Sequence, residues 1–268
     1  MIKGKREVEM VKLGVCGPIA MAETIKAAGF DYFEGGVSEV LCPLESDALF
    51  TERLAALQRL SIPCQALNGM VPGALKIVGP EVDTAALEHY VAVMTRRAAQ
   101  AGIAVIVFGS GDARRIPDGF DREKAGDQLF WFMRLLGYYA AIAGVVIALE
   151  PLNKGETNIF NTAGEGGEWV KRVDRPGFRL LVDAYHLMRE EEPAEIITNE
   201  TPLIAHMHVA TKMGRFAPGL EQCPELDSFY AAVKASGYSG RLSIEGNAGD
   251  NPALNLKNAC ALLRNALS

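Results

Sequence analysis

The sequence predicts an α/β fold of the (β/α)8 TIM-barrel type in a single domain, and three observations support this prediction. Eight short apolar runs alternate with eight longer amphipathic segments, which is the strand–helix order of this barrel. The length of 268 residues suits a fold that often takes about 250, so we expect one domain over residues 1–268. Glycine ends several helical segments, where a helix C-terminus favours a positive φ: Gly29, Gly102, Gly144 and Gly237.

The eight apolar runs are rich in Val, Ile, Leu and aromatic residues, which is typical of parallel strands buried on both faces. In chain order, the predicted strands are Lys12–Gly17, Tyr32–Gly36, Cys64–Gly69, Val105–Gly109, Val145–Leu152, Phe178–Asp183, Leu203–Ala210 and Arg241–Gly246. Most segments between them carry apolar residues at helical spacing. The predicted helices are Ala20–Ala28, Ser46–Leu60, Thr84–Ala101, Arg122–Ala143, Gly164–Val173, Ala194–Asn199, Glu225–Ser236 and Pro252–Leu267.

A doubly wound open sheet is the alternative architecture for this order of elements. A glycine-rich dinucleotide loop after the first strand would favour it. The corresponding segment, Val15–Ala20, has the sequence VCGPIA and lacks the GxGxxG pattern. The closed barrel is therefore the preferred prediction.

Charge and composition argue against several classes of protein. The net charge of −6 disfavours a general nucleic-acid binder or a membrane-surface protein, because both need a basic face. The five cysteines are widely spaced and form no CxxC pair, so we expect free thiols in a reducing compartment. The N-terminal residues contain no apolar signal region, and no run reaches about 18 apolar residues. We therefore expect a soluble cytoplasmic protein.

Polar residues stand at the ends of the last four predicted strands, where the active sites of (β/α)8 barrels lie. In order, these are Glu150, Asp183, the pair His206 and His208, and Glu245. Three buried carboxylates without partners would be very costly, and a divalent cation would remove their repulsion. Three carboxylates and one imidazole suit one Mn²⁺, Mg²⁺ or Co²⁺ ion, with Zn²⁺ also possible.

The histidines near these strand ends carry separate predictions. Positions two apart share one face of a strand, so His206 and His208 can both point into the barrel, with His208 nearer the mouth. This leaves open whether His206 is itself a ligand or supports the ligands from one layer deeper, and we expect the supporting role. His186 follows the sixth strand by three residues, where it can reach a substrate.

The segments that carry these residues resemble the xylose-isomerase-like TIM barrels. The matching motifs are Leu149–Asn153 (LEPLN), Val182–His186 (VDAYH), His206–His208 (HMH) and Ile244–Gly246 (IEG). The resemblance extends in strand order over essentially the whole chain. The pattern is most similar to that of the ketose 3-epimerases, such as D-tagatose 3-epimerase and D-psicose 3-epimerase.

The resemblance implies a role for each of these residues. The four metal ligands of the family match Glu150, Asp183, His208 and Glu245, and Mn²⁺ is the expected ion. Its two acid–base catalysts match Glu150 and Glu245. Its residues that contact the sugar match His186, Arg215 and Glu156, and Asn68 begins a loop that lines the sugar pocket.

The implied reaction is a proton transfer at a carbon next to a carbonyl group of a sugar. The metal acts as a Lewis acid that stabilises an enediolate, while one glutamate removes the proton and the other returns one. The same residues suit epimerisation and aldose–ketose isomerisation. The resemblance also implies a homodimer or homotetramer, with a small-molecule sugar or cyclitol as the partner and neither nucleic acid nor membrane.

The sequence departs from the family pattern in two places. Assigning Arg215 assumes a one-residue insertion after His208, and the segment Asn68–Gly73 has no close match in the family. Gly246–Asp250 follows the eighth strand, where such barrels often bind phosphate. Because Asp250 would repel phosphate, we expect an unphosphorylated sugar or cyclitol.

Three other functions share parts of this pattern. An inosose-dehydratase-like lyase uses much the same ligand set. An apurinic-site endonuclease-like hydrolase shares the barrel but needs a three-zinc cluster, and this chain has only four histidines. A non-catalytic sugar-binding barrel would not need two opposed carboxylates.

Overall fold

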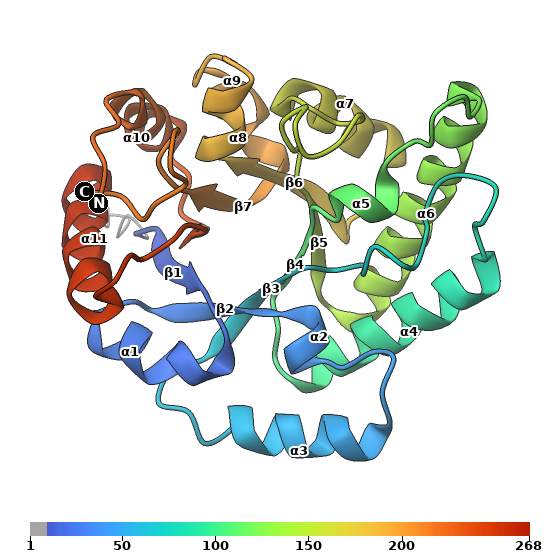
Figure 1. Ribbon diagram of the computed structural model, residues 1–268, viewed down its shortest axis with the longest axis horizontal. Helices are drawn as coiled ribbons and strands as arrows, with labels where there is room; N and C mark the ends of the chain where they lie inside the picture. Colours follow the sequence, from blue (N-terminus) through green and yellow to red (C-terminus); the bar gives the residue numbers. More distant parts are fainter. Residues whose placement is uncertain (1–9) are drawn as a thin grey trace, which may run out of the picture.

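The computed structural model describes residues 10–268, which form a closed barrel of eight parallel strands in sequence order. In Figure 1 the strands lie at the centre and the helices surround them. This confirms the predicted barrel, and the open doubly wound sheet is wrong. The first nine residues of the expected domain lie outside the described residues. The strands are β1 (Lys12–Cys16), β2 (Tyr32–Gly36), β3 (Cys64–Asn68), β4 (Val105–Phe108), β5 (Val146–Leu149), β6 (Phe178–Asp183), β7 (Ile204–Val209) and β8 (Arg241–Ile244).

Every predicted helical segment contains a helix, and shorter helices occur between them. The α-helices are α1 (Ala22–Ala27), α2 (Val37–Val40), α3 (Asp47–Leu57), α4 (Thr84–Gln100), α5 (Gly111–Arg114), α6 (Arg122–Ala143), α7 (Ala163–Val173), α8 (Ala184–Arg189), α9 (Ile196–Glu200), α10 (Glu225–Ser236) and α11 (Pro252–Leu267). Two 3-10 turns, η1 (Ile19–Met21) and η2 (Thr201–Leu203), complete the set. The unpredicted helices α2, α5 and α8 have only four to six residues, too few to show a helical period.

Local signals fix the ends of the longer helices. Asp83, Asp121 and Thr162 precede α4, α6 and α7, and each side chain accepts a backbone N–H from the first turn. The four glycines predicted to end helices have φ values between 69° and 97°. These ends let the chain turn sharply from each helix into the next strand.

The strand register brings the C-terminal ends of β4 to β8 to one level. Phe108 pairs with Leu149, so Glu150 follows at the height of Gly109. Asp183 pairs with His208. Below this level, apolar side chains fill the barrel, among them Tyr32, Ala66, Val107, Ala148 and Leu181. A larger apolar cluster lies between the strands and the helices, so both faces of the sheet are buried.

Among residues 10–268, no helix combines the length and the apolar character that crossing a membrane requires. The five cysteines are free thiols.

Candidate active site

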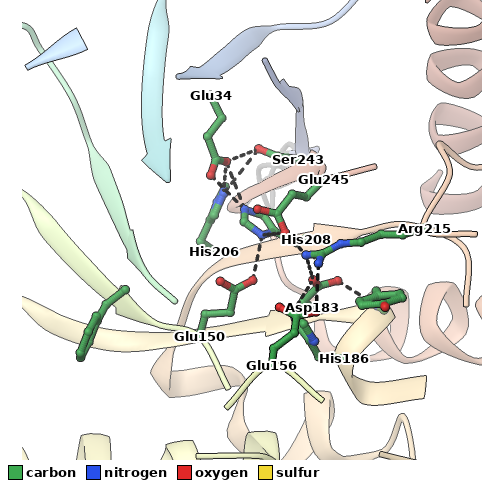
Figure 2. Close-up of polar contacts among 12 residues, drawn as sticks. Glu34, Glu150, Glu156, Asp183, His186, His206, His208, Arg215, Ser243 and Glu245 are labelled. Carbon is green, nitrogen blue, oxygen red and sulfur yellow. Dashed lines mark hydrogen bonds and ion pairs between the residues drawn. The ribbon is translucent and has the colours of Figure 1, made fainter. Parts of the chain in front are cut away.

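Four side chains predicted to bind a metal meet at the mouth of the barrel. One ligand atom from each of Glu150, Asp183, His208 and Glu245 lies within 4.8 Å of the others. The His208 Nδ1 atom is 3.1 Å from Glu150 Oε1 and 3.5 Å from Glu245 Oε2. Glu150, Asp183 and His208 are buried, and Glu245 is partly exposed. Figure 2 shows the carboxylates gathered around the imidazole of His208.

The Glu150 carboxylate occupies space that a glycine leaves open. A Cβ atom on Gly109, at the end of β4, would lie 2.5 Å from Glu150 Oε2. The buried Arg114 of α5 donates to the carbonyl groups of Phe108 and Glu150, at 3.0 and 2.8 Å. Its guanidinium also packs between the rings of Phe108 and Phe160. The backbone of Glu150 is therefore fixed by a buried cation.

The short helix α8 orients both Asp183 and His186. Asp183 Oδ1 accepts the backbone N–H of Tyr185 at 2.8 Å, which is an N-cap contact. His186 Nδ1 accepts the backbone N–H of Asn153 at 3.1 Å, so its proton lies on Nε2. Asp183 Oδ2 and His186 Nε2 are buried without a hydrogen-bond partner among the described residues. Both atoms are thus available to a ligand.

Arg215 enters the site from the β7–α10 loop. Its guanidinium lies 2.5 Å from Glu245, 3.2 Å from Glu156 and 3.7 Å from Asp183, and it stacks on the ring of Tyr185. Its carbonyl oxygen accepts the N–H of Asn247 at 2.8 Å. The loop after β7 is thereby joined to the loop after β8. The structure places Arg215 beside the other site residues, and its role as a substrate contact stays a prediction.

The two remaining predicted substrate contacts differ in their surroundings. Glu156 accepts from the side chain of Asn153 at 3.0 Å and reaches into the same cluster as Arg215. Asn68 is half-buried at the end of β3, opposite Gly36. Within residues 10–268, no hydrogen bond joins its side chain to the other site residues. Its role as a substrate contact stays a prediction.

Burial and mutual repulsion raise the pKa values of the carboxylates, and neighbouring cations lower them. Burial raises the pKa of Asp183 to about 8, with Glu150 and Glu245 adding to the rise. The pKa of Glu150 is raised, first by burial and then by Glu245. Burial also acts to raise the pKa of Glu245, but His208 and Arg215 outweigh it and lower that pKa. The cluster therefore has more negative charge than its own cations neutralise.

These residues fit a divalent cation. Asp183 Oδ2 accepts no hydrogen bond from residues 10–268, and three carboxylate oxygens and one imidazole nitrogen converge on one place. Oxygen-rich sites with one imidazole suit Mn²⁺, Mg²⁺ and Co²⁺, and Zn²⁺ accepts the same donors. The pKa of Asp183 is raised, and a cation bound beside this carboxyl group would lower it again.

Glu34, on β2, is a site residue that sequence reasoning missed. It is fully buried, and its carboxylate lies 2.8 Å from His206 Nε2 and 3.0 Å from His208 Nε2. His206 is directed toward Glu34 (Figure 2). It precedes His208 by two positions on β7 and so lies one layer deeper in the barrel. The available signal was a single acidic residue in the middle of the otherwise uncharged segment Tyr32–Gly36. Arg114 was missed because α5 was not predicted.

Comparisons with known proteins agree with this geometry. A family model described as Xylose isomerase-like TIM barrel matches residues 22–266. The 3-dehydro-D-guloside 4-epimerase of Escherichia coli is 28% identical over 54% of this chain and 53% of its own length. The L-ribulose 3-epimerase of a Methylomonas species is 32% identical over 50% of this chain and 46% of its own length. This chain thus matches about half the length of these two curated relatives.

Solved structures show the same fold. The structure of a D-psicose 3-epimerase with D-tagatose, from Clostridium cellulolyticum, superposes with a TM-score of 0.83 at 19% identity. The superposition covers 96% of this chain and 100% of that one. Together with the family match over nearly the whole chain, this establishes that the protein belongs to the xylose isomerase-like TIM barrel family.

Proposed function

We propose that the protein is a divalent-metal-dependent isomerase of a sugar or cyclitol, which moves a proton at a carbon next to a carbonyl group. The observation that supports this most is the convergence of Glu150, Asp183, His208 and Glu245, because two of the four are glutamates able to exchange protons. The names of the relatives, a 4-epimerase and a 3-epimerase, support the same class of reaction.

The two glutamates carry the proton in this proposal. One carboxylate takes the proton from the substrate C–H bond. The electron pair of that bond forms a C=C double bond to the carbonyl carbon, and the π pair of the C=O bond moves onto the oxygen, which gives an enediolate. The other carboxylic acid returns a proton to the opposite face of the same carbon, which inverts it. Return at the neighbouring carbon would move the carbonyl group instead. A divalent cation, Mn²⁺ as the first choice, would be held by the four converging residues and supplies Lewis-acid stabilisation of this charge.

The surrounding residues orient the substrate. His186 offers its Nε2–H to a substrate oxygen, since that buried donor has no partner among the described residues. Arg215 donates to another substrate oxygen. His208 first, and then Arg215, lower the pKa of Glu245. Glu156, joined to Arg215 at 3.2 Å, accepts from a substrate hydroxyl group.

An unphosphorylated substrate is the form we propose. The loop after β8 is the usual phosphate position in such barrels, but two of its N–H groups already have acceptors. Asn247 N–H donates to the carbonyl of Arg215, and Gly249 N–H donates to the side chain of Asn247, both at 2.8 Å. A phosphate group there would compete with existing hydrogen bonds.

The test is exchange of substrate C–H protons with solvent in D₂O, over a panel of ketoses and inososes with Mn²⁺ present. The wild-type protein should place deuterium beside a carbonyl group in at least one panel member. Glu150→Gln and Glu245→Gln should each lower the exchange rate by at least about 100-fold, while the exposed Glu81→Gln leaves it unchanged. Exchange at the wild-type rate in either glutamine variant would contradict the proposal.

The same experiment distinguishes the other functions. A lyase would convert an inosose to a product lighter by one water molecule. A sugar-binding barrel would bind panel members without exchange. The three-metal hydrolase has less support, because the metal-binding groups among residues 10–268 are two and share His208.

A further inference from the structure

A buried carboxylate lies deeper in the barrel than the four converging residues, on the side away from its mouth. Glu34 belongs to β2 and has no exposed surface, and neither do His206, His208 or Ser243 around it. An ionised carboxylate in such a place needs several donors aimed at it. Figure 2 shows Glu34 on one side of His208, with Glu150 and Asp183 on the other.

The directions of the hydrogen bonds around Glu34 can be assigned. Ser243 donates its hydroxyl proton to Glu34 Oε2 at 2.7 Å, so the Tyr32 hydroxyl, 2.8 Å away, donates to Ser243. The Nε2 atom of His206 lies 2.8 Å from Glu34 Oε2. The Nε2 atom of His208 lies 3.0 and 3.2 Å from the two carboxylate oxygens. Since a carboxylate only accepts, both histidines carry a proton on Nε2.

This assignment determines which nitrogen of His208 faces the site. With Nε2–H donated to Glu34, only Nδ1 remains to bind an ion, and Nδ1 is the atom next to Glu150 and Glu245. We propose that Glu34 is a positioning residue for His208: it accepts Nε2–H, which leaves Nδ1 as the nitrogen that gives up its proton to a bound ion, and it holds Nδ1 toward the metal position. It acts through His208 and does not touch the substrate.

His206 has a different part in this arrangement. It donates to the same oxygen of Glu34, and its Nδ1 atom has no partner within residues 10–268. Its ring stands nearly perpendicular to that of His208, with 5.0 Å between centroids. As an additional donor to Glu34, His206 holds the carboxylate in place, so that Glu34 cannot turn away from His208.

The inference rests on the proposed metal-dependent function, and its readout is metal affinity rather than turnover. Loss of a carboxylate behind a metal-binding histidine commonly weakens metal binding 10- to 100-fold. We expect Glu34→Gln to raise the Kd for Mn²⁺ by that factor, measured by calorimetry or by competition with a chelator. The glutamine amide has no negative charge, and its NH₂ group would face the N–H and O–H donors that bind the Glu34 carboxylate in the wild-type protein.

The matched control is Tyr32→Phe. This variant removes a hydroxyl group from the same buried network but leaves every contact between Glu34 and the histidines. Its Kd for Mn²⁺ should stay within about twofold of wild type, even if its Tm falls. An unchanged Kd in a folded Glu34→Gln protein would mean that Glu34 only stabilises the barrel, and would overturn the inference.

A measurement on the wild-type protein covers the case in which Glu34→Gln does not fold. Nitrogen-15 spectra of the histidine rings, with Mg²⁺ bound, should show a proton on Nε2 of His208 and none on Nδ1. The opposite tautomer would overturn the inference.

A cobalt spectrum tests a competing arrangement, because Cys16, Glu34 and His208 also lie close enough to hold an ion. A thiolate-to-Co²⁺ charge-transfer band would place the ion on Glu34 itself and contradict a positioning role. Its absence, with Co²⁺ bound, supports the inference. Wild-type protein that binds no divalent ion would instead overturn the proposed function. Metal binding without any exchange would contradict that function and leave the role of Glu34 standing.

Discussion

At the scale of single residues, the position of the Glu150 carboxylate depends on a glycine and an arginine. Gly109 leaves the space that Glu150 Oε2 occupies, and Arg114 holds the backbone on either side of it. Neither residue offers a group to the substrate. Both act by fixing a proton-transferring group, and small displacements of such a group are costly in rate.

Gly109→Ala should displace the Glu150 carboxylate, since the added Cβ would lie 2.5 Å from Oε2. We expect a loss of at least about 10-fold in substrate proton exchange, with the fold retained. Gly126→Ala is the control, because the nearest atom to its new Cβ is 4.0 Å away. That substitution lies within α6 and should leave exchange unchanged while stabilising the helix by about 0.5–1 kcal/mol. Normal exchange in Gly109→Ala would show that Glu150 tolerates displacement.

The site residues that could be predicted from sequence are those that directly follow an apolar run. Glu150 and Glu245 are such residues, and their strand ends share one face of the barrel. Glu34 could not be predicted in this way because it lies inside β2, and not at a strand end. Its partners lie more than 170 positions away in sequence, and only barrel closure brings them together.

At the scale of elements, a buried arginine of α4 holds the segment between α2 and α3. Arg97 is 2% exposed and donates to the carbonyl groups of Leu41, Cys42 and Glu45. It also pairs with Asp47, whose side chain is 73% exposed. The two buried carbonyl groups, those of Leu41 and Cys42, contribute more to stability than the exposed ion pair.

Arg97→Met should lower the free energy of unfolding by about 3 kcal/mol, because it leaves buried carbonyl groups without donors. Arg96→Met is a close control. Arg96 binds the same Asp47 at 3.2 Å but is half exposed, so its loss should change stability by less than about 0.5 kcal/mol. Urea unfolding measures both, and hydrogen exchange should locate the loosening in residues 41–47. Equal effects from the two variants would refute this account.

The long elements were predictable because their period extends over many residues, as in α4 and α6. The short helices α5 and α8 were not, although they place Arg114 and His186 at the site. Each has six residues or fewer, and their helical form depends on tertiary contacts. Asp183, for example, ends β6 and also caps α8.

At the scale of the whole molecule, the acidic cluster makes the metal-free protein sensitive to pH. The folded-state pKa of Asp183 is raised to about 8 by burial and by its neighbours. Burial alone would lower the pKa of His208, but Glu34 and Glu245 raise it well above its ordinary value. Both groups hold protons in the folded state that the unfolded chain releases. Stability therefore falls as pH rises between about 6 and 8.

The expected result is a lower Tm at pH 8 than at pH 6 in chelator-treated protein. The slope is at most about 1.4 kcal/mol per pH unit for each retained proton. The pKa values of Glu34 and Glu245 are lowered in the folded state, so these groups make stability rise with pH. Their effect is confined to pH values below about 4.5, the ordinary pKa of a glutamate. Asp183→Asn should flatten the dependence, and saturating Mn²⁺ should remove or reverse it, because deprotonated ligands bind metal better. Metal-free protein that is more stable at pH 8 would contradict this.

Closure of the whole barrel was predictable from the strict alternation of strands and helices. The homodimer or homotetramer stays a prediction. Exposed apolar side chains occur on α6, at Tyr138 and Ile142, and on α11, at Leu254 and Leu262.

The central claim is that the four converging residues bind one divalent cation that the reaction requires. The most direct measurement is the metal content of the purified protein, paired with substrate proton exchange before and after chelation. We predict one divalent ion per chain, loss of exchange after chelation, and recovery with Mn²⁺. Asp183→Ala should bind less than a stoichiometric amount. Full exchange in metal-free protein, or no ion bound after reconstitution with any of the four candidate metals, would contradict the claim.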